Sequence, residues 1–498
     1  MRIIRACREM GISPVAVFSE CDRTALHVRA ADEAYAIGPS PPRESYLRID
    51  TLIDVAKRSG ADAVYPGYGF LAENEDFAAA VRDAGLTFIG PTPEAIEAMG
   101  SKTAARSAAM RAGVPVVPGT EQPLAANASD ESIARAADAI GSPLLVKAVA
   151  GGGGKGMRTV NEPGDLSSAV RAARSEAGSA FGDAAVYLER RLTRPRHIEV
   201  QLLGDTHGTV LPFVERECSI QRRHQKVIEE SPSLVMTPAL RAKMTAAAAG
   251  VARTVGYTNA GTIEFLVDER GAFYFLEMNT RLQVEHPITE MVTGLDLVHW
   301  QIRIARGERL DLDPAALVEP KGHAIECRIY AEDPDSGFLP SPGRIQMLRT
   351  PGGPGVRDDS SAAAGLEVPI FYDPLISKLV AWAEDRPRAI ARMRRALSEY
   401  LVAGIKTTVP FFSWLLAEDD FLQGRFHTTY LDEVLASRNG RRFVESSADQ
   451  EDVAAIAAAV QAALSPASVS TAAPAAGARD GAGGRWKSVA RAEGLRGS

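Results

Sequence analysis

Alternation of apolar and polar stretches predicts a chain of three folded segments and a tail. Short apolar runs separated by helical patterns predict a parallel α/β unit over residues 1–100, with strands at 15–18, 63–65 and 87–89. Residues 101–306 predict a helix beginning at Ser101, a sheet around a glycine-rich loop, and a larger antiparallel sheet. We expect that larger sheet to include strands at 187–189, 197–203, around Glu264 and around Glu277.

The remaining residues predict a third unit and a tail of different composition. Residues 320–435 predict an α+β unit. Residues 440–498 predict an alanine-rich helix, a low-complexity disordered linker and a basic end.

Between Glu277 and Glu285 every odd position carries a strong polar group. In an extended strand, alternate side chains share a face, so Glu277, Asn279, Arg281, Gln283 and Glu285 would project to one side. Turn residues at 268–271 precede this run, and a hairpin there would bring Glu264 beside Glu277 and Asn279. The plainer interpretation is an edge strand with a solvated face.

The polar face offers the ligands of a nucleotide-bound metal. Two carboxylates and an amide oxygen (Glu264, Glu277 and Asn279) are the hard donors that Mg²⁺ prefers, with phosphates completing its shell. Without a cation, adjacent glutamates would repel and hold protons. The sequence therefore predicts a divalent metal, Mg²⁺ or Mn²⁺, with a phosphate on it.

A phosphate-binding loop is predicted between two apolar strands. The strand ending at Lys147 runs into the four glycines Gly151, Gly152, Gly153 and Gly154, and another strand resumes at Met157. Glycines let backbone amides approach an anion closely. The loop matches neither the P-loop nor the dinucleotide fingerprint. A glycine hairpin over a nucleotide is typical of ATP-grasp enzymes.

Composition excludes several other classes of protein. The 498 residues are 45% hydrophobic and 24% charged, as in ordinary globular proteins. A net charge of −7 argues against nonspecific nucleic-acid binding. The four cysteines form no close metal-binding pair, and no apolar run has the length of a membrane span. We expect a cytoplasmic protein with no membrane or nucleic-acid partner.

Several motifs together resemble the biotin carboxylase component of biotin-dependent carboxylases, in the ATP-grasp superfamily. They span roughly residues 1–435 and occur at 65–71, in the glycine loop, and at 218–226, 277–286, 326–334 and 338–343. The resemblance implies an N-terminal parallel α/β domain (1–100), an ATP-grasp domain (101–306) and a C-terminal α+β biotin carboxylase domain (320–435).

The resemblance also implies a role for each candidate residue. Arg281, Glu285, Arg328 and Lys226 would be catalytic, with Glu285 as the general base and Arg328 stabilising a biotin enolate. Bicarbonate would lie against Lys226, Arg281, Gln283, Val284 and Glu285, and biotin against Arg328, Tyr68 and Asp373. Glu264, Glu277 and Asn279 would bind metal. ATP would contact Lys102, Lys147, Gly151 to Gly154, Glu189, Arg190, Leu192, His197, Gln221, His224, Glu264 and Glu277.

The implied reaction is ATP-dependent carboxylation of biotin by bicarbonate, through carboxyphosphate, in an acetyl-CoA-type acyl-CoA carboxylase. Residues after 435 contain no Ala-Met-Lys-Met hairpin, so biotin is expected in trans on a carrier protein, with a separate carboxyltransferase and a homodimer. Two alternatives stay open: another ATP-grasp ligase, or an inactive, N-terminally truncated homologue that acts as a binding module.

Two departures from the family pattern bear on these expectations. Relatives begin with a strand and a glycine turn before the first helix, whereas this chain starts inside that helix, so we expect the first domain to lack its first strand and to be less stable. Arg190 stands where relatives often carry lysine, which is not an equivalent hydrogen-bond donor.

Taken singly, the candidates also have ordinary structural explanations. Lys147 could be a strand-end lysine whose charge reaches solvent, and His197 and His224 could be satisfied by hydrogen bonds. Arg328 could be a buried ion-pair partner of Glu326 or Glu332.

Overall fold

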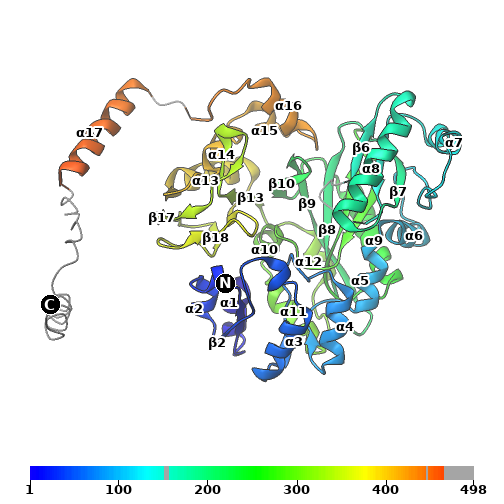
Figure 1. Ribbon diagram of the computed structural model, residues 1–498, viewed down its shortest axis with the longest axis horizontal. Helices are drawn as coiled ribbons and strands as arrows, with labels where there is room; N and C mark the ends of the chain where they lie inside the picture. Colours follow the sequence, from blue (N-terminus) through cyan, green and yellow to red (C-terminus); the bar gives the residue numbers. More distant parts are fainter. Residues whose placement is uncertain (151–155, 445–446, 465–498) are drawn as a thin grey trace, which may run out of the picture. The chain divides into compact units, whose positions relative to one another are not determined.

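A computed structural model describes residues 1–150, 156–444 and 447–464 of the chain (Figure 1). Its contacts divide the chain into two units, Met1–Phe443 and Val444–Ser498. All candidate site residues lie in the first unit. Of the second unit, the structure describes helix α17 (Ala448–Leu464), which confirms the predicted alanine-rich helix. The linker and basic end predicted beyond it lie outside the described residues.

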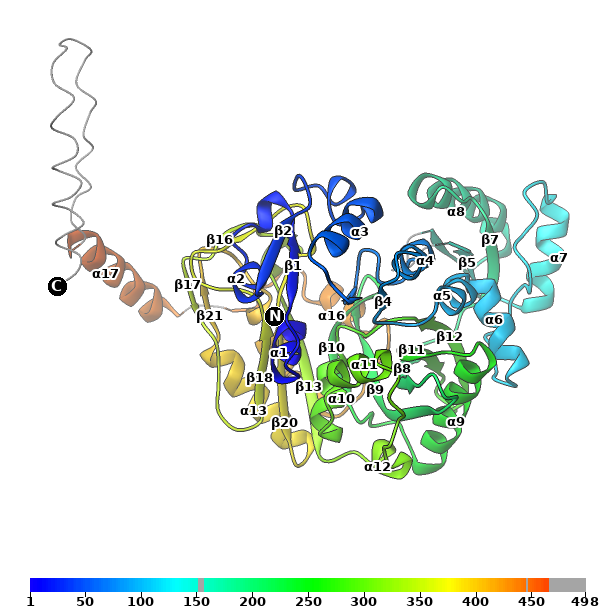
Figure 2. The same ribbon diagram turned by 90° about the horizontal axis from the view of Figure 1, so that it is seen from below.

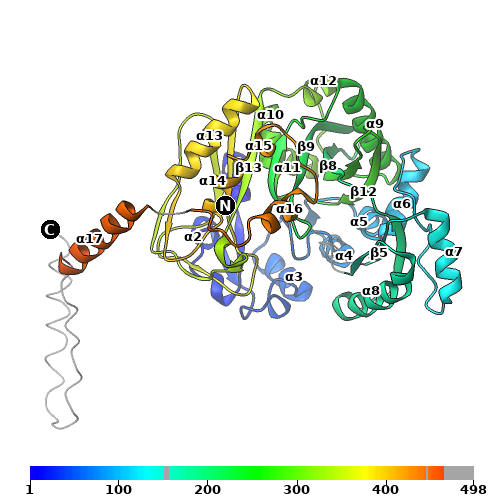
Figure 3. The same ribbon diagram turned by 90° about the horizontal axis from the view of Figure 1, so that it is seen from above.

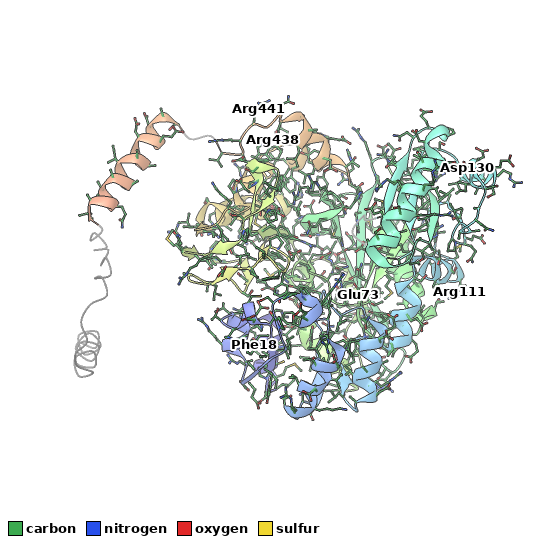
Figure 4. All side chains as sticks on the ribbon, in the orientation of Figure 1. Phe18, Glu73, Arg111, Asp130, Arg438 and Arg441 are labelled. Carbon is green, nitrogen blue, oxygen red and sulfur yellow. The ribbon has the colours of Figure 1, made fainter. Side chains whose placement is uncertain are left out.

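The first segment is built from parallel strand pairs and helices, as predicted. Strand β1 pairs with β2 and β3 pairs with β4, but as two separate two-stranded sheets. Phe18, labelled in Figure 4, ends β1. The elements are α1 (Arg2–Glu9), β1 (Val15–Phe18), η1 (Glu20–Asp22), α2 (Leu26–Ala30), β2 (Glu33–Ala36), η2 (Pro42–Glu44), α3 (Ile49–Arg58), β3 (Ala63–Val64), α4 (Glu75–Asp83), β4 (Thr87–Phe88) and α5 (Pro93–Gly100).

The second segment begins with helix α6, capped by the Ser101 side chain as its sequence predicts. Its elements are α6 (Lys102–Arg111), α7 (Asp130–Ile140), β5 (Leu144–Ala148), β6 (Met157–Val160), η3 (Pro163–Asp165), α8 (Leu166–Phe181), β7 (Val186–Arg190), β8 (Arg196–Gly204), β9 (Val210–Arg222), β10 (Gln225–Ser231), α9 (Pro238–Thr254), β11 (Asn259–Val267), β12 (Phe273–Asn279), α10 (His286–Thr293), α11 (Leu297–Ala305) and α12 (Pro314–Val318).

A small antiparallel sheet in the order β6-β5-β7 carries the glycine loop between β5 and β6. Helix α8 packs on all three strands (Figure 1). The prediction that 187–189 belong to the larger sheet is therefore wrong. Strand β7 instead pairs with β5, because the apolar faces of both strands are needed to bury α7 and α8 in a separate core.

The large sheet has eight strands in the order β12-β11-β8-β9-β10-β13-β20-β18. It crosses from the second segment into the third, because β10 pairs with β13. Helix α9 packs on β8 and β9, and α13 packs on β13, β20 and β18 (Figure 3). Helix α10 packs on β9, β10, β13 and β20. This one sheet thus carries Glu264, Glu277, Lys226 and Arg328 of the candidate site.

The third segment completes this sheet and adds short strand pairs around it (Figure 2). Its elements are β13 (His323–Tyr330), β14 (Glu332–Asp333), η4 (Pro334–Ser336), β15 (Leu339–Pro340), β16 (Gly343–Arg344), β17 (Met347–Arg349), β18 (Val356–Ser360), β19 (Glu367–Val368), β20 (Leu375–Ala383), α13 (Arg386–Glu399), β21 (Leu401–Ala403), α14 (Val409–Leu415), α15 (Asp419–Leu422) and α16 (Tyr430–Ser437). No helix among the described residues combines the length and hydropathy needed to cross a bilayer.

Candidate active site

The hairpin predicted before Glu277 is confirmed. Strands β11 and β12 are antiparallel, with Glu264 directly opposite Glu277 and Thr262 opposite Asn279. Asp268 closes the turn, because its Oδ1 accepts hydrogen bonds from the backbone amides of Arg270 and Ala272, both at 2.9 Å. Paired residues on antiparallel strands project to the same face, so the two carboxylates lie on one side of the sheet.

The prediction of an extended strand as far as Glu285 is wrong. Strand β12 ends at Asn279, and Glu285 is the N-cap residue of α10, whose proline at the first turn favours a helix start there. The polar side chains still converge. Arg281 donates hydrogen bonds to Asn279 Oδ1 at 3.1 Å and to Gln283 Oε1 at 2.9 Å, and Gln283 Nε2 donates to Glu264 Oε1 at 3.2 Å.

The two hairpin carboxylates have different surroundings. Glu264 accepts hydrogen bonds from Asn279 Nδ2 and Lys226 Nζ, both at 2.8 Å, and lies 2.8 Å from His197 Nε2. Burial alone would raise the pKa of Glu264, but Lys226 and His197 hold it below its usual value. No hydrogen bond or ion pair joins the Glu277 carboxylate to another described residue. Burial and the charge of Glu264 raise the pKa of Glu277.

Lys226 on β10 lies among three carboxylates. Its Nζ is 2.5 Å from Glu199 Oε2, 2.8 Å from Glu264 Oε1 and 2.7 Å from Glu285 Oε1. Burial lowers the pKa of Lys226, but these three charges outweigh burial and raise it well above its ordinary value. The ammonium group is therefore a fixed positive charge that joins β8, β11 and the start of α10.

Arg328 on β13 lies between two buried carboxylates. Its guanidinium donates to Glu285 Oε2 at 2.9 Å and to Glu229 Oε1 at 2.6 Å. It forms an ion pair with neither Glu326 nor Glu332. Glu332 is paired with Arg222 instead. Burial would raise the pKa of Glu285, but Lys226, Arg328 and Arg216 hold it well below its usual value. Glu285 is thus an ionised carboxylate, fully buried between two cations.

The phosphate-side lysines lie on the central strand of the small sheet and at the start of α6. Lys147 Nζ donates to Glu189 Oε1, and Arg106 Nη1 donates to Glu189 Oε2 at 3.1 Å. Burial would lower the pKa of Lys147, but Glu189 raises it above its usual value. Lys102 is the first residue of α6, and burial lowers its pKa. The predicted Gly151 to Gly154 lie outside the described residues.

The residues predicted to line the adenosine occupy neighbouring strand ends. Glu189 and Arg190 end β7 and Leu192 follows it. Gln221 Nε2 lies 2.8 Å from His197 Nδ1 and donates to the Cys218 carbonyl at 2.8 Å. His224 and Arg223 form the turn between β9 and β10, both with positive φ, of 66° and 51°.

The predicted biotin-side residues lie toward the third segment. Tyr68 is 40% exposed, and Lys378 Nζ lies 5.5 Å from its ring centroid. Lys378 also donates to the Val284 carbonyl at 3.0 Å. Asp373 is exposed, and its Oδ1 accepts from the Leu375 amide at 2.9 Å. Through Lys378, Tyr68 connects with the bicarbonate-side backbone at Val284.

Several residues of this site were not predicted from the sequence. Glu73, labelled in Figure 4, accepts from Arg281 Nε at 2.7 Å and from the Thr280 amide at 2.9 Å. Glu199 bridges Lys226 and Arg216, whose Nε lies 2.5 Å from Glu199 Oε1. The polar alternation of His197, Glu199 and Gln201 on β8 was a signal that could have revealed Glu199. Glu73, in a loop, carries no such signal.

The arrangement can hold an anionic substrate beside an ionised carboxylate. Lys226, Arg281, Arg328 and Lys378 supply positive charge, and Glu285 lies among them as an acceptor for a proton. At the hairpin end, Glu277 and Glu264 supply oxygen donors for a divalent cation. These are the requirements of phosphoryl transfer onto a small oxyanion.

Family models match three consecutive parts of the chain. The biotin carboxylase N-terminal domain matches residues 1–96, and the carbamoyl-phosphate synthase L chain ATP binding domain matches 101–313. The biotin carboxylase C-terminal domain matches 326–433.

Curated proteins and solved structures are similar over nearly the same length. A pyruvate carboxylase subunit from Methanothermobacter thermautotrophicus is 53% identical over 433 residues, 87% of each chain. The biotin carboxylase of a Nostoc species is 52% identical over 434 residues, 87% of this chain and 96% of the relative. A biotin carboxylase–βγ-ATP complex from Campylobacter jejuni aligns with a TM-score of 0.84 and 46% identity, covering 87% of this chain and 96% of that one.

A second solved structure is the biotin carboxylase domain dimer of Hydrogenobacter thermophilus 2-oxoglutarate carboxylase, in complex with MgADP, ADP and bicarbonate. It aligns with a TM-score of 0.85 and 46% identity, covering 90% of this chain and 96% of that one.

Proposed function

The chain belongs to the biotin carboxylase family, and from this membership we propose that it is the biotin carboxylase subunit of an acyl-CoA carboxylase of the acetyl-CoA type. It is an ATP-dependent ligase that carboxylates biotin. The observation that carries the residue assignments is the position of Glu285, an ionised carboxylate between Lys226 and Arg328.

The metal and nucleotide belong at the hairpin and the small sheet. Glu264, Glu277 and Asn279 would hold Mg²⁺ or Mn²⁺, which supplies charge neutralisation on the ATP phosphates. The fit is supported by Glu277, whose pKa is raised by burial and by Glu264 and which has no cationic hydrogen-bond partner among the described residues. Lys102 and Lys147 would contact phosphates with Gly151 to Gly154. Glu189, Arg190, Leu192, His197, Gln221 and His224 would line the adenosine.

Bicarbonate would lie against Lys226, Arg281, Gln283 and the Val284 backbone. Its negative charge competes for the cations that surround Glu285, which raises the proton affinity of that carboxylate. Glu285 would then accept the bicarbonate proton as the bicarbonate oxygen attacks the γ-phosphorus and the bond from the γ-phosphorus to the bridging oxygen breaks, giving carboxyphosphate and ADP. Arg281 is held for this task by Glu73 at 2.7 Å and by Gln283 at 2.9 Å.

Decarboxylation of carboxyphosphate would leave CO₂ beside phosphate, which can remove the proton from biotin N1. Arg328 would stabilise the resulting enolate, since its guanidinium is a fixed cation that needs no reorganisation, and N1 would then attack the carbon of CO₂ to form carboxybiotin. Tyr68 and Asp373 would contact the biotin side. Biotin would arrive on a separate carrier protein, and a carboxyltransferase and a second copy of this chain would complete a cytoplasmic enzyme.

A pyruvate carboxylase is the second candidate for the complete enzyme. It is favoured by the 53% identity to a relative named as part of a pyruvate carboxylase. The residues of the site do not distinguish the two, because the acyl acceptor is carboxylated by another component.

The direct test is ATP hydrolysis by the purified chain, with bicarbonate and free biotin each added or omitted. We expect hydrolysis that requires bicarbonate and rises with biotin. Hydrolysis stimulated by ammonia or an amine instead would indicate another ATP-grasp ligase. No hydrolysis by a folded protein would indicate a binding module.

The acceptor is tested by mixing the chain with candidate carrier and carboxyltransferase subunits from the same organism. Radiolabelled bicarbonate should be fixed onto acetyl-CoA. Fixation onto pyruvate alone would refute the acyl-CoA assignment and leave the biotin carboxylase activity intact.

A further inference from the structure

Two glutamates lie face to face behind Arg328. Glu229 on β10 is directly opposite Glu326 on β13 in the antiparallel register, so their side chains share one face of the sheet. Strands β10 and β13 also lie side by side in Figure 2. Both side chains are 0% exposed. Like charges directly opposite each other are destabilising, and burial removes the water that would screen them.

The hydrogen bonds of this pair are incomplete. Glu229 Oε1 accepts from Arg328, but Glu229 Oε2 and both oxygens of Glu326 have no hydrogen-bond partner. A buried ionised carboxylate without a donor is one of the most unfavourable groups in a protein. A single proton on Glu326 would remove one charge and supply a donor for its neighbour.

The charged groups around the pair do not provide a cation for each carboxylate. Arg328 is already shared by Glu229 and Glu285, and Lys378 hydrogen-bonds to the Val284 carbonyl. The titratable and charged groups that interact electrostatically with the pair are Glu285 from the start of α10, Cys218 from β9, Lys226 from β10, Cys327, Arg328 and Tyr330 from β13, and Lys378 from β20. Burial raises the pKa of Cys218, Cys327 and Tyr330 above their ordinary values, so these three groups add no charge at neutral pH.

We propose that Glu229 and Glu326 together hold one proton at neutral pH and that this pair is a positioning device for Arg328. The neutral Glu326 donates to Glu229 Oε2, and Glu229 remains ionised with its Oε1 toward Arg328. The effect of the Arg328 position on catalysis rests on the proposed function, in which Arg328 contacts biotin. Glu229 and Glu326 touch no substrate and are positioning residues.

The electrostatics of both groups agree with this geometry. Burial, and then the charge of Glu229, raise the pKa of Glu326 well above its usual value. Burial raises the pKa of Glu229 to about 7, with Arg328 opposing and Glu285 adding to the rise. Because the two groups are coupled, the proton belongs to the pair. Loss of this proton at alkaline pH places a second negative charge beside Arg328 and draws the guanidinium away from the position in which Glu285 shares it.

The proton itself can be observed by infrared difference spectroscopy of the full chain at pH 7. The wild-type protein should show the carbonyl stretch of a protonated carboxyl group, and Glu326→Gln should lack it. Glu230→Gln, next to Glu229 on β10, is a matched control. Glu230 is buried but ionised, since His323 and Arg386 hold its pKa at about 2, so its replacement should leave the protonated-carboxyl band unchanged. An identical band in the wild type and Glu326→Gln overturns the proposal.

Kinetics with free biotin separate positioning from simple support of the fold. Glu326→Gln keeps a neutral donor, so the KM for biotin at pH 7 should stay within about threefold of wild type, and the alkaline loss of kcat/KM should become weaker. Glu326→Leu removes the donor and should raise the KM for biotin by about 10-fold or more, the size expected for losing a hydrogen bond to a charged group. If Gln and Leu impair biotin kinetics equally, the shared proton has no positioning role.

The infrared result does not depend on the assigned reaction. A wild-type chain that shows the Glu326-dependent band but no biotin-stimulated ATP hydrolysis would refute the proposed function while supporting the proton. Normal activity with no such band would refute the shared proton and leave the proposed function intact.

Discussion

Replacing Glu285 by glutamine is the most informative single perturbation of this site. The change keeps the shape of the side chain and removes its charge, so it removes the proposed base. Two cations lose a partner, but neither is left alone. Lys226 keeps Glu199 and Glu264, and Arg328 keeps Glu229.

The structure allows the two effects to be scaled separately. Loss of general-base assistance should lower bicarbonate-dependent ATP hydrolysis by ~10²-fold or more. Removing one partner of a buried ion pair, so that the other charge is left uncompensated, destabilises a protein by about 3–5 kcal/mol; because both cations keep carboxylates we expect about 1–3 kcal/mol here. The rate of ATP hydrolysis should therefore fall by a larger factor than the fraction of folded protein.

The assay is phosphate release under saturating ATP and bicarbonate, with circular dichroism as the measure of folding. Glu230→Gln is the control, because Glu230 is equally buried and ion-paired but lies away from Lys226 and Arg328. It should lose stability with little loss of turnover per folded molecule. Wild-type turnover in folded Glu285→Gln would refute the assignment of the base.

Three further outcomes are expected. Glu277→Gln should weaken Mn²⁺ binding in the presence of ATP by roughly 10-fold or more, because it removes one of few protein ligands, and calorimetry with and without ATP should show useful affinity only with the nucleotide. Glu73→Gln should raise the KM for bicarbonate by about 10-fold, since Arg281 loses a charged partner at 2.7 Å; an unchanged KM would exclude this role. Glu230 has a pKa of about 2 in the folded protein against an ordinary 4.5, so its ionised form stabilises the fold above pH 4.5, and this stabilisation is lost as pH falls toward 2. In urea unfolding at pH 7, Glu230→Gln should be less stable than wild type by roughly 3 kcal/mol. The difference between the two proteins should be smaller at pH 3.

The sequence predicted which polar side chains come together at the site better than it predicted the secondary structure that carries them. The alternation from Glu277 to Glu285 correctly grouped Asn279, Arg281 and Gln283, whose side chains contact one another. Period-two alternation cannot reveal where a strand stops, and here it stops at Asn279 before the start of α10. A proline two residues after Glu285 was the local signal of that helix start.

Long-range strand pairing limited the prediction of the fold. Local patterns identified β7 as a strand, but both faces of β7 are largely buried, so its burial does not indicate which sheet it joins. The pairing of β10 with β13, which brings Glu229 opposite Glu326, joins residues about 100 positions apart. Buried glutamates such as Glu229 resemble surface residues in a sequence until their strand neighbours are known.

The strand order explains why the site requires a proton beside Arg328. On the site face, the outer strands β12, β11 and β8 carry Glu277, Glu264 and Glu199, where a divalent cation is needed for neutrality. The following strands β9, β10, β13 and β20 carry Arg216, Lys226, Arg328 and Lys378, where anions derived from bicarbonate and biotin would be stabilised. Glu229 and Glu326 are acids on this cationic half. With both ionised, they would neutralise the field that holds the anions, whereas one shared proton preserves it. The same sheet can therefore favour a metal on its outer strands β12 and β11 and an oxyanion on its interior strands only while that proton is in place.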